Sequence, residues 1–249
     1  MSRPDQFAAL RAQIAAAGSG ETGRGAEARL RFGVEAIDGV LPCSGLAVGS
    51  HEVCAGGPDL PHEAASAQLA AYLLGQVSGP VVWALPRLTL FPPGLAEAGL
   101  SSARVIYAEA GRDEDVLAVA EEALRHGGLA GVICEPSRLS LTASRRLQLA
   151  AEAGGAPALV LRRWRRGAPP TEGTACATRW SVTARPSADQ SGLPRAYWRL
   201  ELTRCRGGRP AAWDVALEAG DEPGTTLRLR LAGEMASGQA DAKAGRRAA

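Results

Sequence analysis

Short strand-like runs alternate with helix-like segments through the middle of the chain, and this alternation limits the folds open to it more than any other feature. The runs predicted as strands cover residues 50–55, 81–85, 103–108, 129–134 and 157–161. The segments predicted as helices cover residues 62–76, 113–126 and 142–153. Short apolar runs of this kind are typical of strands buried on both faces. Alternating strands and helices predict an α/β fold, with a mostly parallel sheet flanked by helices.

After residue 170 the pattern changes, and polar and apolar residues alternate with a period of two. Antiparallel strands at the C-terminal side, added to the sheet edge or folded beside it, are predicted for residues 178–184, 197–203, 211–218 and 225–231. Trp180, Trp198 and Trp213 each share a strand face with aliphatic residues, which favours core packing over base stacking. Arg179 and Arg199 then belong to the opposite, outward face.

The two ends of the chain differ from this α/β region. Phe7, Leu10 and Ile14 have helical spacing, and a Gly-rich stretch follows them. We therefore expect an N-terminal helix and flexible linker (1–28), an α/β domain (29–231) and a disordered tail (232–249). An isolated helix this short is only marginally stable in water. It must therefore dock on its own domain or on a partner, and we expect a partner.

Composition excludes several classes of protein. The 249 residues contain no apolar run long enough to cross a membrane, and the N-terminus lacks a secretory pattern, so we expect a cytoplasmic protein. The five Cys and three His show no ligand spacing, which argues against a disulfide framework and a metal site. Lys243 is the only Lys, which excludes mechanisms that need a Lys inside the fold.

Charge is distributed unevenly along the chain. Between Arg162 and Arg209, eleven Arg stand against three acidic residues, a balance of +8. Because the whole chain carries +2, the remainder carries −6. Such an asymmetry points to an anionic partner on one side of the molecule.

The strand, glycines and helix near residue 56 occupy the place of a phosphate-binding loop. A working loop reads G-x-x-x-x-G-K-[ST], with backbone N–H groups and a Lys for the phosphates and a hydroxyl for Mg²⁺. Counted from Gly56, which Gly57 follows, Pro61 stands at the second Gly, His62 at the Lys and Glu63 at the hydroxyl residue. Proline removes an N–H, and Glu63 adds negative charge. The sequence predicts a degenerate loop without nucleotide hydrolysis, and no cofactor.

Several stretches are similar to a known family. Residues 32–41 and 44–53, with Gly33, Ile37, Asp38, Gly45, Leu46 and Gly49, resemble the entry to the ATPase core of RecA. Further on, the stretches 91–95, 121–125, 144–151 and 204–210, with Trp213, resemble the ImuA family, RecA-like proteins of bacterial mutagenesis cassettes. The resemblance covers roughly residues 29 to 218 and implies a RecA-like core.

Membership of that family implies a non-catalytic adaptor in damage-induced (SOS) translesion DNA synthesis. The implied partners are RecA, the polymerase-like ImuB and, indirectly, an error-prone C-family DNA polymerase, while direct binding of single-stranded DNA is left open. Two alternatives remain: an ATP-dependent recombination or repair enzyme, and a cell-division inhibitor similar to SulA. The missing Lys and the Pro61-His62-Glu63 triplet argue against the ATP-dependent enzyme.

The resemblance also singles out candidate site residues. Glu135 ends the strand that carries the Walker B carboxylate in RecA-like proteins, and is either a vestige of that Mg²⁺ ligand or a carboxylate in solvent or capping a turn. The run Arg162, Arg163, Trp164, Arg165 and Arg166 begins where RecA-like proteins have their second DNA-binding loop, and suits phosphates and bases. Arg204 and Arg206 are candidates for contacting RecA or DNA, or form a charge pair at a hairpin turn.

Overall fold

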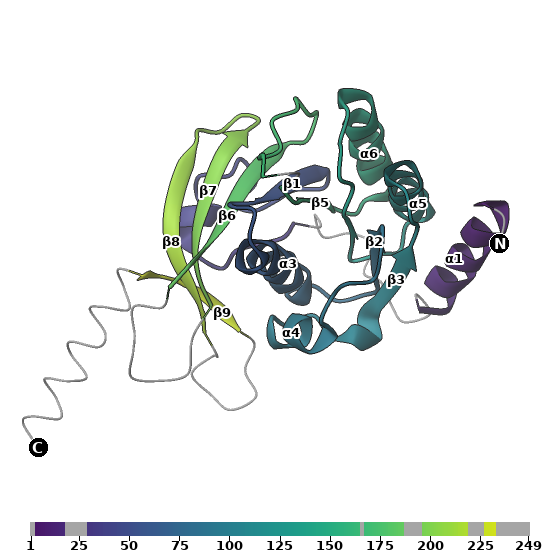
Figure 1. Cartoon of the computed structure of the whole chain (residues 1–249), viewed down its shortest axis with the longest axis horizontal. Helices are drawn as coiled ribbons and strands as arrows, with labels where there is room; N and C mark the ends of the chain where they lie inside the picture. The colour runs from purple at the N-terminus through teal and green to yellow at the C-terminus, as the bar shows by residue number, and fades with distance from the viewer. Residues whose placement is uncertain (1–2, 18–28, 165–166, 187–195, 219–226, 233–249) are drawn as a thin grey trace, which may run out of the picture.

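The computed structural model describes residues 3–17, 29–164, 167–186, 196–218 and 227–232. These residues build a nine-stranded sheet with the order β3-β2-β4-β5-β1-β6-β7-β8-β9 (Figure 1). The strands are β1 (Ser50–Ala55), β2 (Val81–Leu85), β3 (Val105–Glu109), β4 (Gly131–Cys134), β5 (Ala158–Arg162), β6 (Thr178–Arg185), β7 (Ala196–Cys205), β8 (Ala211–Glu218) and β9 (Arg228–Leu231).

Strands β1 to β6 pair in parallel, and β6 to β9 pair in antiparallel fashion. This confirms the predicted mostly parallel sheet with antiparallel strands at its C-terminal side. Strand β6 joins the two parts of the sheet, because it lies antiparallel to β7 but parallel to β1, with Trp180 opposite Val53. The segment between β5 and β6 returns across the sheet before β6 begins. A period of two cannot reveal strand direction, since both kinds of ladder share it.

Helices cover both faces of the parallel strands (Figure 1). One face carries α3 (Leu60–Gly75) and α4 (Pro92–Glu97), and the other carries α5 (Asp113–His126) and α6 (Leu141–Gly154). Two short elements, α2 (Glu35–Asp38) and the 3₁₀ turn η1 (Ser102–Arg104), complete the fold. The buried apolar residues form two clusters, one beneath α3 that continues under β7 to β9, and one beneath α5 and α6.

Helix α3 begins two residues before the predicted start, and this places the degenerate loop. Asp59 is its N-cap residue, and Pro61 lies within the first turn. Proline is tolerated there because the N–H groups of the first turn have no partner inside the helix. The residue that spoils the phosphate loop therefore helps to start the helix.

The N-terminal helix α1 (Arg3–Ala17) packs on its own chain. Leu10 and Ile14 are buried in the cluster beneath α5, and Arg11 pairs with Glu122 of α5 at 2.6 Å. The helix therefore docks on its own domain, which is one of the two possibilities left open by the sequence. The predicted linker lies outside the described residues, and so does the predicted tail apart from residue 232. The domain boundaries therefore stay predictions.

The C-terminal tryptophans pack as predicted. Trp180 and Trp198 are fully buried, Phe32 and Trp180 have ring centroids 4.7 Å apart, and Trp213 follows Trp180 at 6.1 Å. Arg199 lies on the opposite face, 3.0 Å from a carboxylate oxygen of Asp214 on β8.

Candidate functional site

The loop between β1 and α3 is packed against β6, and several backbone donors of the loop and of the first turn of α3 are engaged. The N–H of Gly56 donates to the carbonyl of Val182 at 2.8 Å, and the N–H groups of His62 and Glu63 donate to Asp59 at 3.0 and 3.3 Å. Pro58 and Pro61 have no N–H. The loop therefore offers fewer N–H groups to a phosphate than a working loop, which needs several converging donors.

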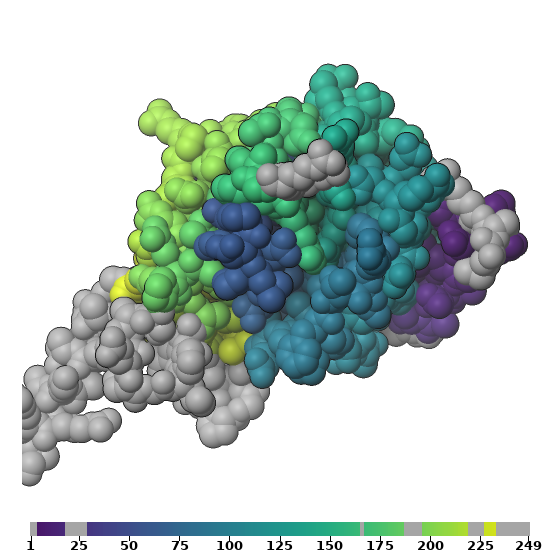
Figure 2. All heavy atoms as spheres, in the orientation of Figure 1, coloured from purple at the N-terminus to yellow at the C-terminus, as the bar shows by residue number. Residues whose placement is uncertain are grey.

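The glycines of this loop serve close packing. A Cβ atom on Gly56 would lie 2.0 Å from the Thr183 hydroxyl, and one on Gly57 would lie 2.4 Å from the His62 ring. Nδ1 of His62 in turn accepts the Ala184 N–H at 2.9 Å. The side chain at the position of the phosphate-binding Lys is therefore folded back onto its own loop. In Figure 2 the dark-blue surface near the centre belongs to α3 and the loop before it.

Arg163 connects α3 to the end of β4 across the degenerate loop. Its guanidinium lies 2.9 Å from a carboxylate oxygen of Glu63 on α3 and 2.7 Å from one of Glu135 after β4. The other oxygen of Glu135 accepts the indole N–H of Trp83 at 2.7 Å. P-loop enzymes hold phosphates and Mg²⁺ between these two elements. In this chain the Arg163 guanidinium bridges two carboxylates at that place.

This geometry corrects the alternatives for Glu135. The side chain is 5% exposed, so it does not lie in solvent, and its donors are the side chains of Trp83 and Arg163 rather than N–H groups of the following turn. Both of its oxygens have protein donors, and a Mg²⁺ ligand would have to give up the one that Arg163 occupies.

Arg162 is excluded from any contact with DNA, contrary to the sequence-based prediction. It is 1% exposed and reaches Glu52 and Glu172, each at 3.0 Å. Glu52, itself fully buried, also binds Arg179 at 2.7 Å and the Thr174 hydroxyl at 3.1 Å. This network, formed by Glu52, Arg162, Glu172, Thr174 and Arg179, fastens the segment between β5 and β6 to the centre of the sheet. We call it the Glu52 network.

The Glu52 network also corrects the outward placement of Arg179. The residue does lie on the face opposite Trp180, but that face is covered there by the segment 172–174, so Arg179 is only 20% exposed. Sequence reasoning missed Glu52, although a signal existed. A carboxylate within a strand that is buried along its whole length must be paired.

The side chains of the remaining described candidates donate hydrogen bonds to backbone carbonyls. The indole N–H of Trp164 donates to the Ala55 carbonyl at 2.7 Å. Arg204 and Arg206 are exposed and donate to the carbonyls of Thr174 and Ala175 respectively. They brace the segment that follows the Arg-rich run, rather than only facing each other at a turn. Arg165 and Arg166 lie outside the described residues.

The comparison with known proteins agrees with the fold. No family model matches the chain. Protein ImuA of Caulobacter vibrioides, from strains NA1000 / CB15N and ATCC 19089 / CIP 103742 / CB 15, is 40% identical over 234 residues, covering 88% of this chain and 95% of each relative. The chain belongs to the ImuA family. The crystal structure of the RadB recombinase superimposes with a TM-score of 0.55 at 14% identity, over 76% of this chain and 96% of that one.

The RadB likeness shows that this member of the ImuA family has the RecA-like fold, as the sequence predicted. Within the described residues, no group of three His, Cys, Asp or Glu side chains could hold a metal ion, and no helix is long and apolar enough to cross a membrane. What distinguishes the site is the pairing of Arg163 with carboxylates on both sides of it.

Proposed function

We propose that this ImuA-family chain is a non-catalytic RecA-like adaptor in damage-induced translesion DNA synthesis, and that it binds ImuB and RecA. Through ImuB it contacts an error-prone C-family DNA polymerase only indirectly. The family assignment supports the pathway, and the Arg163 bridge between Glu63 and Glu135 carries the claim that no nucleotide chemistry occurs.

The physical argument is one of charge and donors. A nucleotide with Mg²⁺ brings phosphates that need N–H donors and a Lys, while the loop offers Pro61, His62 and Glu63. The phosphates would also have to displace Arg163 from two carboxylates, one of which is almost fully buried. Leaving a buried charge without its partner is strongly unfavourable.

Calorimetry with ATP and Mg²⁺ tests the absence of nucleotide binding. We expect no heat of binding at micromolar concentrations and no release of phosphate. A micromolar dissociation constant, or measurable phosphate release, would favour the alternative of an ATP-dependent repair enzyme. No observation in the described residues favours the cell-division inhibitor.

Partner binding needs a separate experiment with purified components. The full chain is immobilised and offered ImuB, RecA and single-stranded DNA one at a time, with and without ATP. We expect ImuB and RecA to be retained equally in both conditions. A matched variant with Pro61→Gly, His62→Lys and Glu63→Thr restores the sequence of a working loop, and it should retain both partners to the same extent. Retention that requires ATP, or no retention of either protein, would contradict the adaptor.

A further inference from the structure

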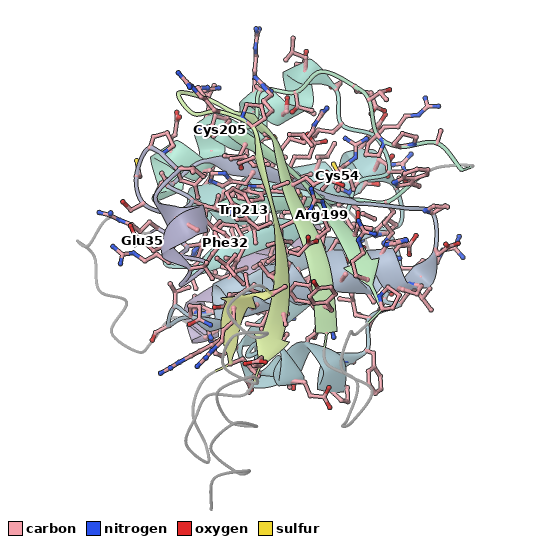
Figure 3. All side chains as sticks on the ribbon, turned by 90° about the vertical axis from the view of Figure 1, so that its left-hand side faces the viewer. Phe32, Glu35, Cys54, Arg199, Cys205 and Trp213 are labelled. Carbon is pink, nitrogen blue, oxygen red and sulfur yellow. The ribbon has the colours of Figure 1, made fainter. Side chains whose placement is uncertain are left out.

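The turn between β7 and β8 carries three exposed Arg side chains, Arg204, Arg206 and Arg209, and we call residues 204–209 the basic turn. Figure 3 looks onto this side of the molecule, with Cys205 labelled in the turn. Arg204 and Arg206 each donate one N–H to a backbone carbonyl, which holds the side chain in place without neutralising its charge. A guanidinium has five N–H donors, so most of them remain available to a ligand.

The positive charge of the basic turn is not compensated by the described part of the chain. No described carboxylate forms an ion pair with any of its three Arg. The acidic residues that flank the turn and its neighbouring segment are paired with other Arg side chains: Glu201 and Asp214 with Arg199, and Glu172 with Arg162. Residues 39–49 and 173–178, which pack around the turn, contain no acidic residue. Because like charges repel, such a cluster favours an anionic ligand from outside.

The loop before β1 forms an apolar surface beside the basic turn. A Cβ atom on Gly207 would lie 3.7 Å from the Pro42 ring, so the two segments are in direct contact. The side chain of Val40 is 38% exposed, and Pro42 and Cys43 are exposed as well. An apolar patch therefore lies next to three guanidiniums that have no carboxylate partner.

This combination fits an acidic protein segment better than a nucleic acid. Protein interfaces pair an apolar centre with a polar rim and are enriched in Arg. Interfaces with nucleic acid are more polar and more positively charged, and single strands are held by aromatic stacking as well. Residues 39–45 and 204–210 contain no aromatic residue, and a phosphate backbone would lie against Val40 and Pro42.

We propose that the basic turn and the loop beside it bind an acidic segment of a partner protein, with apolar side chains between its carboxylates. The chain's own segments suit this role poorly. Residues 233–249 carry two acidic and three basic residues, so that segment is not acidic. Residues 219–226 carry two carboxylates but follow the far end of β8, whose eight residues place it about 25 Å from the turn.

The proposed surface lies at the opposite end of the parallel strands from the degenerate loop. Cys205 lies opposite Thr178 on β6, and Thr178 lies opposite His51 near the start of β1. The degenerate loop follows the other end of β1. No nucleotide state enters the argument, so the two proposals fail separately. An acidic probe that does not bind, while ImuB and RecA are retained, removes only the surface. A probe that binds, while neither protein is retained, removes only the adaptor.

Fluorescence anisotropy with the full chain and three fluorescein-labelled probes provides the test. The first probe is a peptide in which Leu and Phe separate Asp and Glu residues. The second has the same charges but Ser in place of the apolar residues, and the third is a single-stranded oligonucleotide of equal charge. We expect the first peptide to bind about tenfold more tightly than the second, as for one buried apolar side chain. The oligonucleotide should bind more weakly than the first peptide.

Three variants test which residues make the contact. Arg209→Glu should weaken both peptides about fivefold, as for the loss of an exposed ion pair. Arg87→Glu reverses another exposed Arg, after β2 at the carboxyl end of the strands, and should bind both peptides within about twofold of the wild type. Val40→Ser should weaken the first peptide and leave the second unchanged, because only the first has apolar side chains.

Alkylation of Cys43 gives an independent footprint. It is the exposed one among the five Cys, all of which lie in the described part of the chain, and the first peptide should slow its reaction. Melting temperatures report whether the variants fold. If Val40→Ser does not, the comparison of the two peptides on the wild type still tests the apolar contact.

Four results would overturn the proposal. Equal losses for Arg209→Glu and Arg87→Glu would show a general charge effect, and a Cys43 that reacts at the same rate with and without peptide would place binding elsewhere. An oligonucleotide that binds more tightly than either peptide would make the turn a nucleic-acid surface. A dimer of the full chain that Arg209→Glu dissociates would identify a second copy as the occupant.

Discussion

The carboxylate of Glu52 and the guanidinium of Arg162 meet at 3.0 Å where solvent is almost wholly excluded, with side-chain exposures of 0% and 1%. Charges this deeply buried are stable only with partners, and the two residues differ in how many they have. Glu52 compensates Arg162 and Arg179 together, whereas Arg162 also has Glu172. The loss of Glu52 would therefore remove the carboxylate partner shared by two guanidiniums, whereas the loss of Arg162 would leave Glu52 paired with Arg179.

Replacing Glu52 should destabilise the fold more than replacing Arg162. Glu52→Met leaves two guanidiniums without their common carboxylate and should lower the free energy of unfolding by about 3–5 kcal/mol. Arg162→Met leaves Glu52 with Arg179 and Thr174, so we expect a smaller loss. Urea denaturation measures both. Arg185→Met, at an exposed position, serves as the control and should change stability by less than about 0.5 kcal/mol. A larger loss for Arg162→Met would contradict this network.

Arg163 should contribute to stability through Glu135 more than through Glu63. Arg163→Ala leaves one oxygen of the buried Glu135 without a donor, which should cost about 1–3 kcal/mol. Adding Glu135→Gln removes the charge but keeps an acceptor for Trp83, so the double variant should regain part of the loss. The double-mutant cycle is measured by chemical denaturation. A loss in the double variant equal to the sum of the losses in the two single variants would show that Arg163 and Glu135 are not energetically coupled.

Stability should fall as the pH drops below about 6.5, through His51. Burial lowers the pKa of this His from 6.5 to about 4, although its bond to the Ala47 carbonyl opposes the shift. The folded state keeps the ring neutral while the unfolded state takes up a proton, so stability is complete above pH 6.5 and declines toward pH 4. The full effect is about 3 kcal/mol.

Two variants isolate the His51 contribution to this pH dependence. His51→Gln cannot take up the proton, so its free energy of unfolding should vary less with pH between 6.5 and 4. His126→Gln, at an exposed position, should keep the wild-type dependence. Identical pH profiles for His51→Gln and the wild type would contradict the assignment.

The N-terminal helix should stabilise its own domain. Ile14 is 2% exposed beneath α5, and Ile14→Ala should lower stability by about 2 kcal/mol or more. Gln13→Ala, on the exposed side of the same helix, should have almost no effect. An unchanged melting temperature after deleting residues 1–17 would mean that the helix docks on a partner instead.

Binding of single-stranded DNA, if the adaptor engages it, should depend on Arg165 and Arg166. Arg162 is buried and Arg163 is paired with two carboxylates, so neither is expected to contribute a phosphate contact. Arg165→Ala with Arg166→Ala should flatten the slope of log K against log salt by about 1.4, from two contacts of about 0.7 each. Fluorescence anisotropy at several salt concentrations measures the slope. An unchanged slope would show that this run makes no phosphate contacts.

Local sequence pattern was sufficient to predict the helices and strands of the parallel part of the sheet. It also shows how the loop after β1 departs from a phosphate-binding sequence. The strand runs and helix periods predicted the parallel sheet, because burial on both faces and helical spacing are visible in consecutive residues. The period of two identified the buried faces of Trp180 and Trp198 for the same reason. Pro61, His62 and Glu63 are neighbours in the chain, so their departure from a phosphate loop needs no structure to be seen.

Only the tertiary structure decided which charges meet. Glu52 and Arg162 are 110 residues apart, Arg163 and Glu63 are 100 apart, and no spacing rule connects such pairs. The direction of β6 depends on the path of the segment before it, and both kinds of ladder share one side-chain period. Of the described Arg residues in the Arg-rich run, Arg162 is therefore buried in the Glu52 network and Arg163 bridges two carboxylates. The difference between them follows from where β5 ends, at Arg162, which the sequence alone does not specify.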